Sequence, residues 1–155
     1  MDKLPILFFF NNTIPGLGFQ AQVVAQGRAL LERGAEEEGE VWVSGVQPGG
    51  IAEGGKDERE AYRKFREFFR CVLLDIAAEA EDFEVFESQV RAFFDEVCAT
   101  SQKMWWRAVH QVRVEKYTEE SLKKRPADTP VKVTVERIGQ LVLEHQTEQE
   151  YDLAA

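Results

Sequence analysis

A long apolar stripe in the middle of the chain constrains the fold more than any other feature. Asp57 is a candidate N-cap with Glu60 three residues later, the arrangement of a capping box. Apolar residues then recur at three- and four-residue spacing, which places them on one face of a long amphipathic helix. Such a stripe has to be covered by a sheet or by another helix. Its members are Tyr62, Phe65, Phe69, Val72, Leu73, Ile76 and Ala80.

A second amphipathic helix is predicted directly after the first. Asp82 is its candidate cap, and the charged residues that follow fall on the side opposite the apolar ones. We therefore expect two helices that present aromatic stripes to the same core. The second stripe consists of Phe83, Phe86, Val90, Phe93, Phe94 and Val97.

Short strands are predicted upstream of the helices. The segments FQAQVVAQGRALLERG and VWVSGV are β-prone and are joined by the acidic AEEEGE, which predicts an antiparallel hairpin. Pro48 to Gly50 break the second strand, and Ile51 to Glu53 form a short third strand. Residues 1–100 thus predict an α+β core, a small antiparallel three-stranded sheet covered by two amphipathic helices. At the hairpin tip, Glu36, Glu37 and Glu38 form either a solvated turn or part of a partner surface.

Residues 101–155 are predicted to form a β-rich C-terminal extension, packed on the core or used in oligomerisation. KMWWRAV fits either a helix end or the start of a strand, and VHQVRVEKY alternates as a strand does. VKVTVERI has a period of two, and QLVLEHQ is a candidate partner strand across Gly139. The polar end EQEYDLAA is expected to fray.

Trp105 and Trp106 form the one dense aromatic cluster outside the two helices. Adjacent residues of a strand face opposite ways, so one of the two rings is expected to stay partly exposed unless another element covers it. An exposed Trp marks an interface, because aromatic side chains are enriched there. Both residues are therefore candidates for a partner surface, beside core packing.

The composition argues against several classes of protein. The formal charge of −9 opposes simple nucleic-acid binding, which depends on Lys and Arg, and suits a basic partner better. LPILFFF is too short to span a membrane and no small-residue cleavage site follows it, so we expect neither a membrane segment nor a signal peptide, and a cytoplasmic location. Cys71 and Cys98 lie within apolar helical patterns, where a free thiol behaves as a small hydrophobe.

No pattern of a catalytic, metal or cofactor site is found. His110 and His145 have no second ligand at a metal spacing, and no Cys–His pair can be recognised. The glycine-rich stretches lack both the GxGxxG pattern and the GK[ST] ending of a phosphate loop. We therefore expect a protein that is not an enzyme, with no cofactor and no metal.

Two resemblances to known families remain. GLGF at Gly16 to Phe19, together with the PGG turn at residues 48–50, resembles the peptide-binding loop of PDZ domains. That resemblance implies a module that binds carboxyl-terminal peptides, but it covers only two short islands. Long helices also follow where PDZ domains have further strands.

A longer series of features occurs in a fixed order over about residues 16–98. These features are Phe19 to Leu31 and Glu40 to Val46 as strands, the Pro48-Gly49 turn, Gly50 to Glu53 as third strand, Gly55, and Glu60-Ala61 in the first helical turn. This series resembles the HicB antitoxins and implies their degenerate RNase H-like fold. The tail lacks the two helices that many HicB proteins add to bind operator DNA, so DNA binding is not expected.

The HicB-like resemblance implies a non-enzymatic antitoxin. Its acidic surface would dock on a small basic RNA-cleaving toxin, a HicA-like protein, and the chain would form a homo-oligomer. A PDZ-like peptide-binding module and an orphan oligomeric scaffold are the alternatives. A hydrolase with RNase H-type chemistry is disfavoured, because that chemistry needs several carboxylates around metal ions and the predicted strands carry almost none in their interiors.

Overall fold

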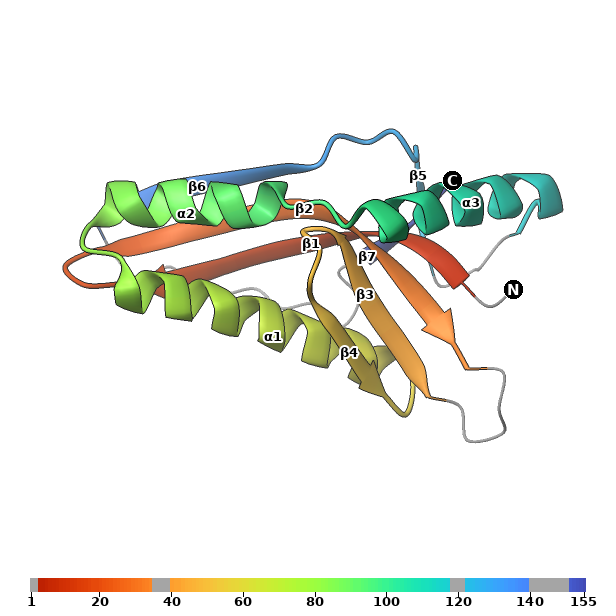
Figure 1. Cartoon of the computed structure of the whole chain (residues 1–155), viewed down its shortest axis with the longest axis horizontal. Coiled ribbons are helices and arrows are strands. Elements are labelled where there is room, and N and C mark those ends of the chain that lie inside the picture. The colour runs from red at the N-terminus through yellow and green to blue at the C-terminus, as the bar shows by residue number, and fades with distance from the viewer. Residues whose placement is uncertain (1–2, 35–39, 118–121, 140–150) are drawn as a thin grey trace.

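A long β-hairpin runs through the whole molecule (Figure 1). The structure is a computed structural model that describes residues 3–34, 40–117, 122–139 and 151–155. Strands β1 (Lys3–Pro15) and β2 (Gln20–Arg33) pair antiparallel along their full length. In the turn between them the Gly16 N–H donates to the Phe19 carbonyl at 2.9 Å, and Gly18 has a φ of 74°, which glycine adopts without strain.

Five more strands complete a mixed sheet in the described part of the chain. Two strands pair with the same edge of β2, one after the other. β6 pairs with residues 20–26 of β2, and β3 pairs with residues 28–33. Strand β7 pairs antiparallel with β1 and parallel with β5, at the other side of the sheet. The five strands are β3 (Val41–Gln47), β4 (Ala52–Gly55), β5 (Lys124–Arg125), β6 (Lys132–Ile138) and β7 (Tyr151–Ala154).

Gly27 lies where the edge of β2 changes partner and the register shifts between Arg28 and Ala29. A Cβ atom at this position would lie 2.5 Å from the Phe8 ring and 2.6 Å from the Gln47 carbonyl oxygen. Only glycine allows the two strands and the ring to approach so closely.

The three described helices are α1 (Glu58–Glu79), α2 (Phe83–Asp95) and α3 (Ala99–Glu115). Both predicted caps are confirmed, since the Asp57 carboxylate accepts the Glu60 N–H at 2.8 Å and Asp82 accepts the Val85 N–H at 2.9 Å. α1 and α2 run antiparallel along the hairpin, and α3 lies towards the opposite end of the molecule from the α1–α2 connection (Figure 1).

Side chains of β1 alternate between two hydrophobic cores, one on each face of the sheet. On the face of α1 and α2, Phe8 packs edge-on against Phe65 with ring centroids 5.2 Å apart, and Phe10 packs against Phe69 at 4.5 Å. On the other face, Leu7 joins a smaller core to which α3 contributes Trp105, Ala108 and Val109. α3 thus covers part of the second face.

The chain changes faces at the edge of β3. The Gly49 N–H donates to the Glu96 carbonyl at 2.9 Å, and the Cys98 N–H donates to the Val46 carbonyl at 3.2 Å. These two bonds fix the connection between α2 and α3 against the end of β3. The cis peptide bond between Gln47 and Pro48 lies between Val46 and Gly49, the two residues that make these bonds.

The structure confirms the α+β class and enlarges the sheet. A three-stranded antiparallel sheet is wrong, because seven strands are described and the β5–β7 pair is parallel. The predicted hairpin is present as β2 and β3, the short third strand is β4, and VKVTVERI forms β6.

Two expectations for the C-terminal third are wrong. VHQVRVEKY lies mainly in α3, because Trp105, Ala108, Val109 and Val112 are buried at helical spacing. The C-terminal end does not fray from Tyr151 onward, since β7 lies between β1 and β5 and Leu153 is fully buried. The segment QLVLEHQ lies outside the described residues.

Candidate functional site

The structure separates the residues expected at a partner surface. Trp105 is fully buried among residues of the sheet and α3, so it cannot belong to a contact surface as the sequence suggested. Trp106 is 39% exposed. One ring of the pair thus remains accessible, on a helix and not on a strand. Glu36, Glu37 and Glu38 lie outside the described residues.

Arg28 of β2 holds the tryptophan pair in place. Its guanidinium carbon lies 4.8 Å from the centroid of the Trp105 ring and 5.4 Å from that of Trp106, and the two rings meet edge-on. Both distances are within the range of a cation–π interaction. Burial lowers the pKa of Arg28, and the nearby Asp128 carboxylate opposes that shift. Trp106 is therefore presented to solvent on a fixed support.

Trp106 belongs to an exposed face of α3, which we call the α3 basic face. Its members occupy positions i, i+3, i+4, i+7 and i+8 of the helix and surround a shallow hollow of about 590 Å³. α3 has no acidic residue before Glu115, in its last turn. The α3 basic face consists of Lys103, Trp106, Arg107, His110 and Gln111.

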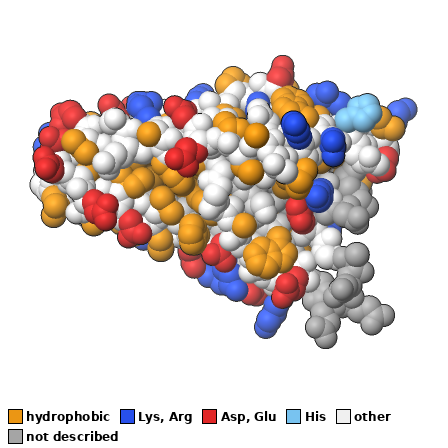
Figure 2. All heavy atoms as spheres, in the orientation of Figure 1, with side chains coloured by type: hydrophobic (Ala, Val, Ile, Leu, Met, Phe, Trp, Pro, Cys, Tyr) orange, Lys and Arg blue, Asp and Glu red, His pale blue; other side chains and the backbone are white. Residues whose placement is uncertain are grey.

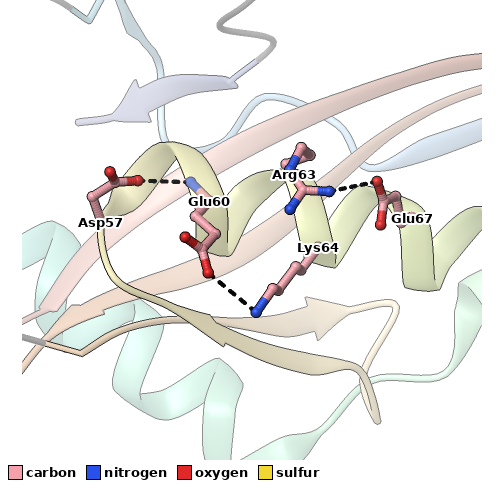
Figure 3. A network of polar contacts seen from close by, with 5 residues as sticks. All are labelled: Asp57, Glu60, Arg63, Lys64 and Glu67. Atoms are coloured by element: carbon pink, nitrogen blue, oxygen red, sulfur yellow. Dashed lines mark hydrogen bonds and ion pairs between the residues drawn. The ribbon is translucent and has the colours of Figure 1, made fainter.

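Cations of α1 and α3 differ in their surroundings. In α1, the Arg63 guanidinium lies 2.7 Å from Glu67, and the Lys64 ammonium lies 3.2 Å from Glu60 (Figure 3). Both are i, i+4 pairs that neutralise the helix surface. Within the described part of the chain, Lys103 and Arg107 of α3 have no ion-pair partner.

The opposite charge gathers at the other end of the molecule. Residues 71–98 contain eight carboxylates and one basic residue, Arg91. Four of the carboxylates are exposed around the connection between α1 and α2, and one of them, Asp82, caps α2. We call the other three, Glu79, Glu81 and Glu84, the acidic tip. Figure 2 shows acidic side chains at this end, and Lys and Arg side chains beside a histidine over α3. The eight are Asp75, Glu79, Glu81, Asp82, Glu84, Glu87, Asp95 and Glu96.

The separation of acidic from basic residues is also present along the sequence, although the net charge of the whole chain does not reveal it. Residues 99–132 contain eight Lys and Arg against four Asp and Glu, a net charge of +4. Because the whole chain has a net charge of −9, the remaining residues together carry −13. Counting charge by segment would have found Lys103 and Arg107, which neither a motif nor the hydrophobic periodicity indicates.

The described residues offer little else for chemistry. They include no group of three or more His, Cys, Asp or Glu that could hold a metal ion. Cys71 and Cys98 are free thiols, His110 is exposed on α3, and His145 lies outside the described residues. Among the described helices, none is both long and apolar enough to cross a membrane.

A second hollow lies on the part of the sheet that α3 leaves open. Its volume is about 360 Å³, and its lining includes Asn11, Val24, Gln26 and Thr134, with Lys132 as the charged member. Gln22, next to it, donates a hydrogen bond to the Asn11 amide oxygen and accepts one from the Thr13 hydroxyl. Thr134 and Lys132 are the side chains of nucleophilic type in this lining, and no carboxylate, histidine or cysteine lies beside them there.

The GLGF stretch forms a structural turn. Gly16 and Gly18 close the β1–β2 hairpin, and the buried Phe19 ring packs 5.3 Å from the Phe86 ring of α2. Comparison with family models, with curated proteins and with solved structures found no match.

Proposed function

We propose that this chain is a HicB-like, non-enzymatic antitoxin that neutralises a small, basic, RNA-cleaving toxin of the HicA-like kind. The order of elements supports the proposal. β2, β3 and β4 are antiparallel neighbours and lead into the capped helix α1, in the order that the resemblance implies for residues 16–98. An analogy of fold does not locate the contact, which depends on the charges of the surface.

The acidic surface of α1 and α2 carries the proposal. Glu79, Glu81 and Glu84 are exposed, and within the described residues none of them has an ion-pair partner. Uncompensated carboxylates attract a basic protein at long range and orient it during encounter, which raises the association rate. The acidic tip is therefore the surface on which the toxin docks.

Neutralisation then follows from covering the toxin. A basic RNA-cleaving protein presents cations to the phosphates of its substrate, and those same cations pair with the acidic tip. RNA and the antitoxin compete for one surface, so no reacting group on this chain is needed. Since exposed charge pairs are screened by salt, binding should weaken as the ionic strength rises.

The test uses the product of the neighbouring gene, which the proposal expects to be a small basic protein. Both proteins are co-expressed and purified, and cleavage of a labelled RNA is followed with and without this chain. Wild-type protein should co-purify with the neighbour and stop cleavage. Glu79→Lys/Glu81→Lys should weaken binding at least tenfold and leave the fold intact, because a Lys at position 79 suits the C-terminal end of α1.

A matched control has the same change in net charge away from the acidic tip. Glu40→Lys/Glu115→Lys alters two exposed carboxylates outside α1 and α2. This variant should protect RNA as wild type does. Absence of a complex with the neighbour, or full protection by Glu79→Lys/Glu81→Lys, would contradict the proposal.

A further inference from the structure

We propose that copies of this chain associate head to tail, with the α3 basic face of one copy on the acidic tip of the next. This inference goes beyond antitoxin activity. It uses the acidic tip named above but requires no toxin, since both contacting surfaces belong to this chain.

The α3 basic face is suited to bind an anionic surface. Lys103 and Arg107 have no ion-pair partner among the described residues, whereas α1 neutralises Arg63 and Lys64 within its own helix. Unpaired cations one turn apart attract a surface that presents carboxylates at similar spacing. Lys103 and Arg107 therefore form the electrostatic half of the contact.

Trp106 provides the anchor of the contact. Its ring is 39% exposed within the cationic face, and Arg28 supports it from behind. A large aromatic ring that is already held in one position loses little conformational freedom on binding. Tryptophan and arginine are also the residues on which interface energy concentrates. On the acidic tip, the half-buried Phe83 and Val85 of α2 offer apolar surface for this ring.

Complementarity within the chain identifies the occupant as a second copy. The acidic tip has the unpaired carboxylates that the α3 basic face lacks, and the two surfaces lie at opposite ends of the molecule (Figures 1 and 2). A molecule of this shape cannot join its own two ends. Contacts between different surfaces of identical chains generate rings or open chains, so the association continues beyond a dimer.

The first test is the mass of the wild-type protein in solution. In sedimentation velocity at low salt, about 0.05 M, the average mass should rise with protein concentration through dimers to larger species. At about 0.5 M salt the same samples should return to monomers, because screening removes the attraction. A monomer at every concentration and low salt would overturn the proposal.

The second test exchanges charges between the two ends. Lys103→Glu/Arg107→Glu removes the basic face, and Glu79→Lys/Glu81→Lys removes the acidic tip, so each variant alone should be monomeric. Mixing the two variants brings opposite charges together at both contacts, because each variant carries the charge that the other has lost, so association should return. The control Lys56→Glu/Lys132→Glu makes the same change in net charge off α3 and should associate as wild type does.

A labelled single-stranded RNA distinguishes the other occupant that a basic aromatic face could accept. RNA binding that is lost in Lys103→Glu/Arg107→Glu, without self-association of the wild type, would overturn the proposal in favour of nucleic acid. The antitoxin proposal is tested separately, because Lys103→Glu/Arg107→Glu leaves the acidic tip intact. That variant should lose self-association and still protect RNA from the toxin.

Discussion

Asp57 and Asp82 show how single side chains determine where the helices begin. Each carboxylate accepts the backbone N–H three residues ahead of it, which otherwise has no partner inside the helix. Replacing either with Ala should lower the free energy of unfolding by about 1 kcal/mol in urea titrations. Asp75→Ala, in the middle of α1, is the matched control and should cost nothing, because Ala favours the helix interior. Equal losses at all three sites would contradict the capping role.

Gly27 is required by close approach rather than by an unusual backbone angle. Gly27→Ala pushes a methyl group against the Phe8 ring and the Gln47 carbonyl, both within 2.6 Å of its ideal position. We expect a loss of about 1–3 kcal/mol in unfolding free energy, the usual cost of overpacking. Gly139→Ala makes the same chemical change where nothing lies within 4 Å, and should leave the urea midpoint nearly unchanged. A similar loss at both sites would contradict the close-approach explanation, because the effect of Ala on the unfolded chain raises stability.

Cys98 differs from an ordinary thiol through its hydrogen bonds. The side chain and backbone of Ser101, followed by the backbone of Thr100, lower the pKa of Cys98, so its thiolate forms at a lower pH than in a free cysteine. In a Cys71→Ser background, Ser101→Ala should move the midpoint of iodoacetamide alkylation against pH upward. Thr100→Ala keeps both contacts from Ser101 and its own backbone, and should leave the midpoint in place. An unchanged midpoint in Ser101→Ala would show that the hydrogen bond has no effect on the thiolate.

Among the helices and strands, the sequence predicts those whose caps and hydrophobic periodicity are local. α1 and α2 combine a cap with an apolar stripe, and β6 has a period of two because one of its faces is buried. The pattern does not predict β1, since both of its faces are covered and LPILFFF shows no alternation. α3 is misread because its stripe begins in the ambiguous WWRAV. The α3 basic face was not predicted for another reason. The net charge of the whole chain sums the basic residues of α3 with the acidic residues at the other end of the molecule.

β7 is a short strand that tertiary contacts stabilise. Only four residues long, it has no sequence pattern, yet Leu153 is fully buried between β1 and β5. Leu153→Ala should therefore lower the free energy of unfolding by about 2–5 kcal/mol, as in other buried sites. Leu17→Ala, at a residue 63% exposed in the β1–β2 turn, should change it by less than about 0.5 kcal/mol. A small effect at Leu153 in urea titrations would show that the end of the chain contributes little to the core.

At the scale of the whole molecule, β1 and β2 connect the two cores. Neighbouring residues of one strand belong to different cores, as Leu7 and Phe8 do, so neither core can lose its packing without disturbing the strand that supports the other. Residues beyond position 100 contribute to both cores, through Trp105 on one side and Val135 and Leu153 on the other. This arrangement favours one cooperative unit over a core with an appended extension.

Cooperativity across the sheet can be measured, because Trp105 and Trp106 lie on the α3 side and Phe69 lies in the core of α1 and α2. Phe69→Ala should lower the unfolding free energy by about 3–5 kcal/mol. In a Trp42→Phe background, where only Trp105 and Trp106 report, the urea midpoint should move equally in tryptophan fluorescence and in far-ultraviolet circular dichroism, because a two-state unit gives coincident transitions. Phe68→Ala, at an exposed neighbour, should leave both midpoints in place. A fluorescence midpoint that stays at the wild-type value in Phe69→Ala would show that α3 and its core unfold independently of α1 and α2.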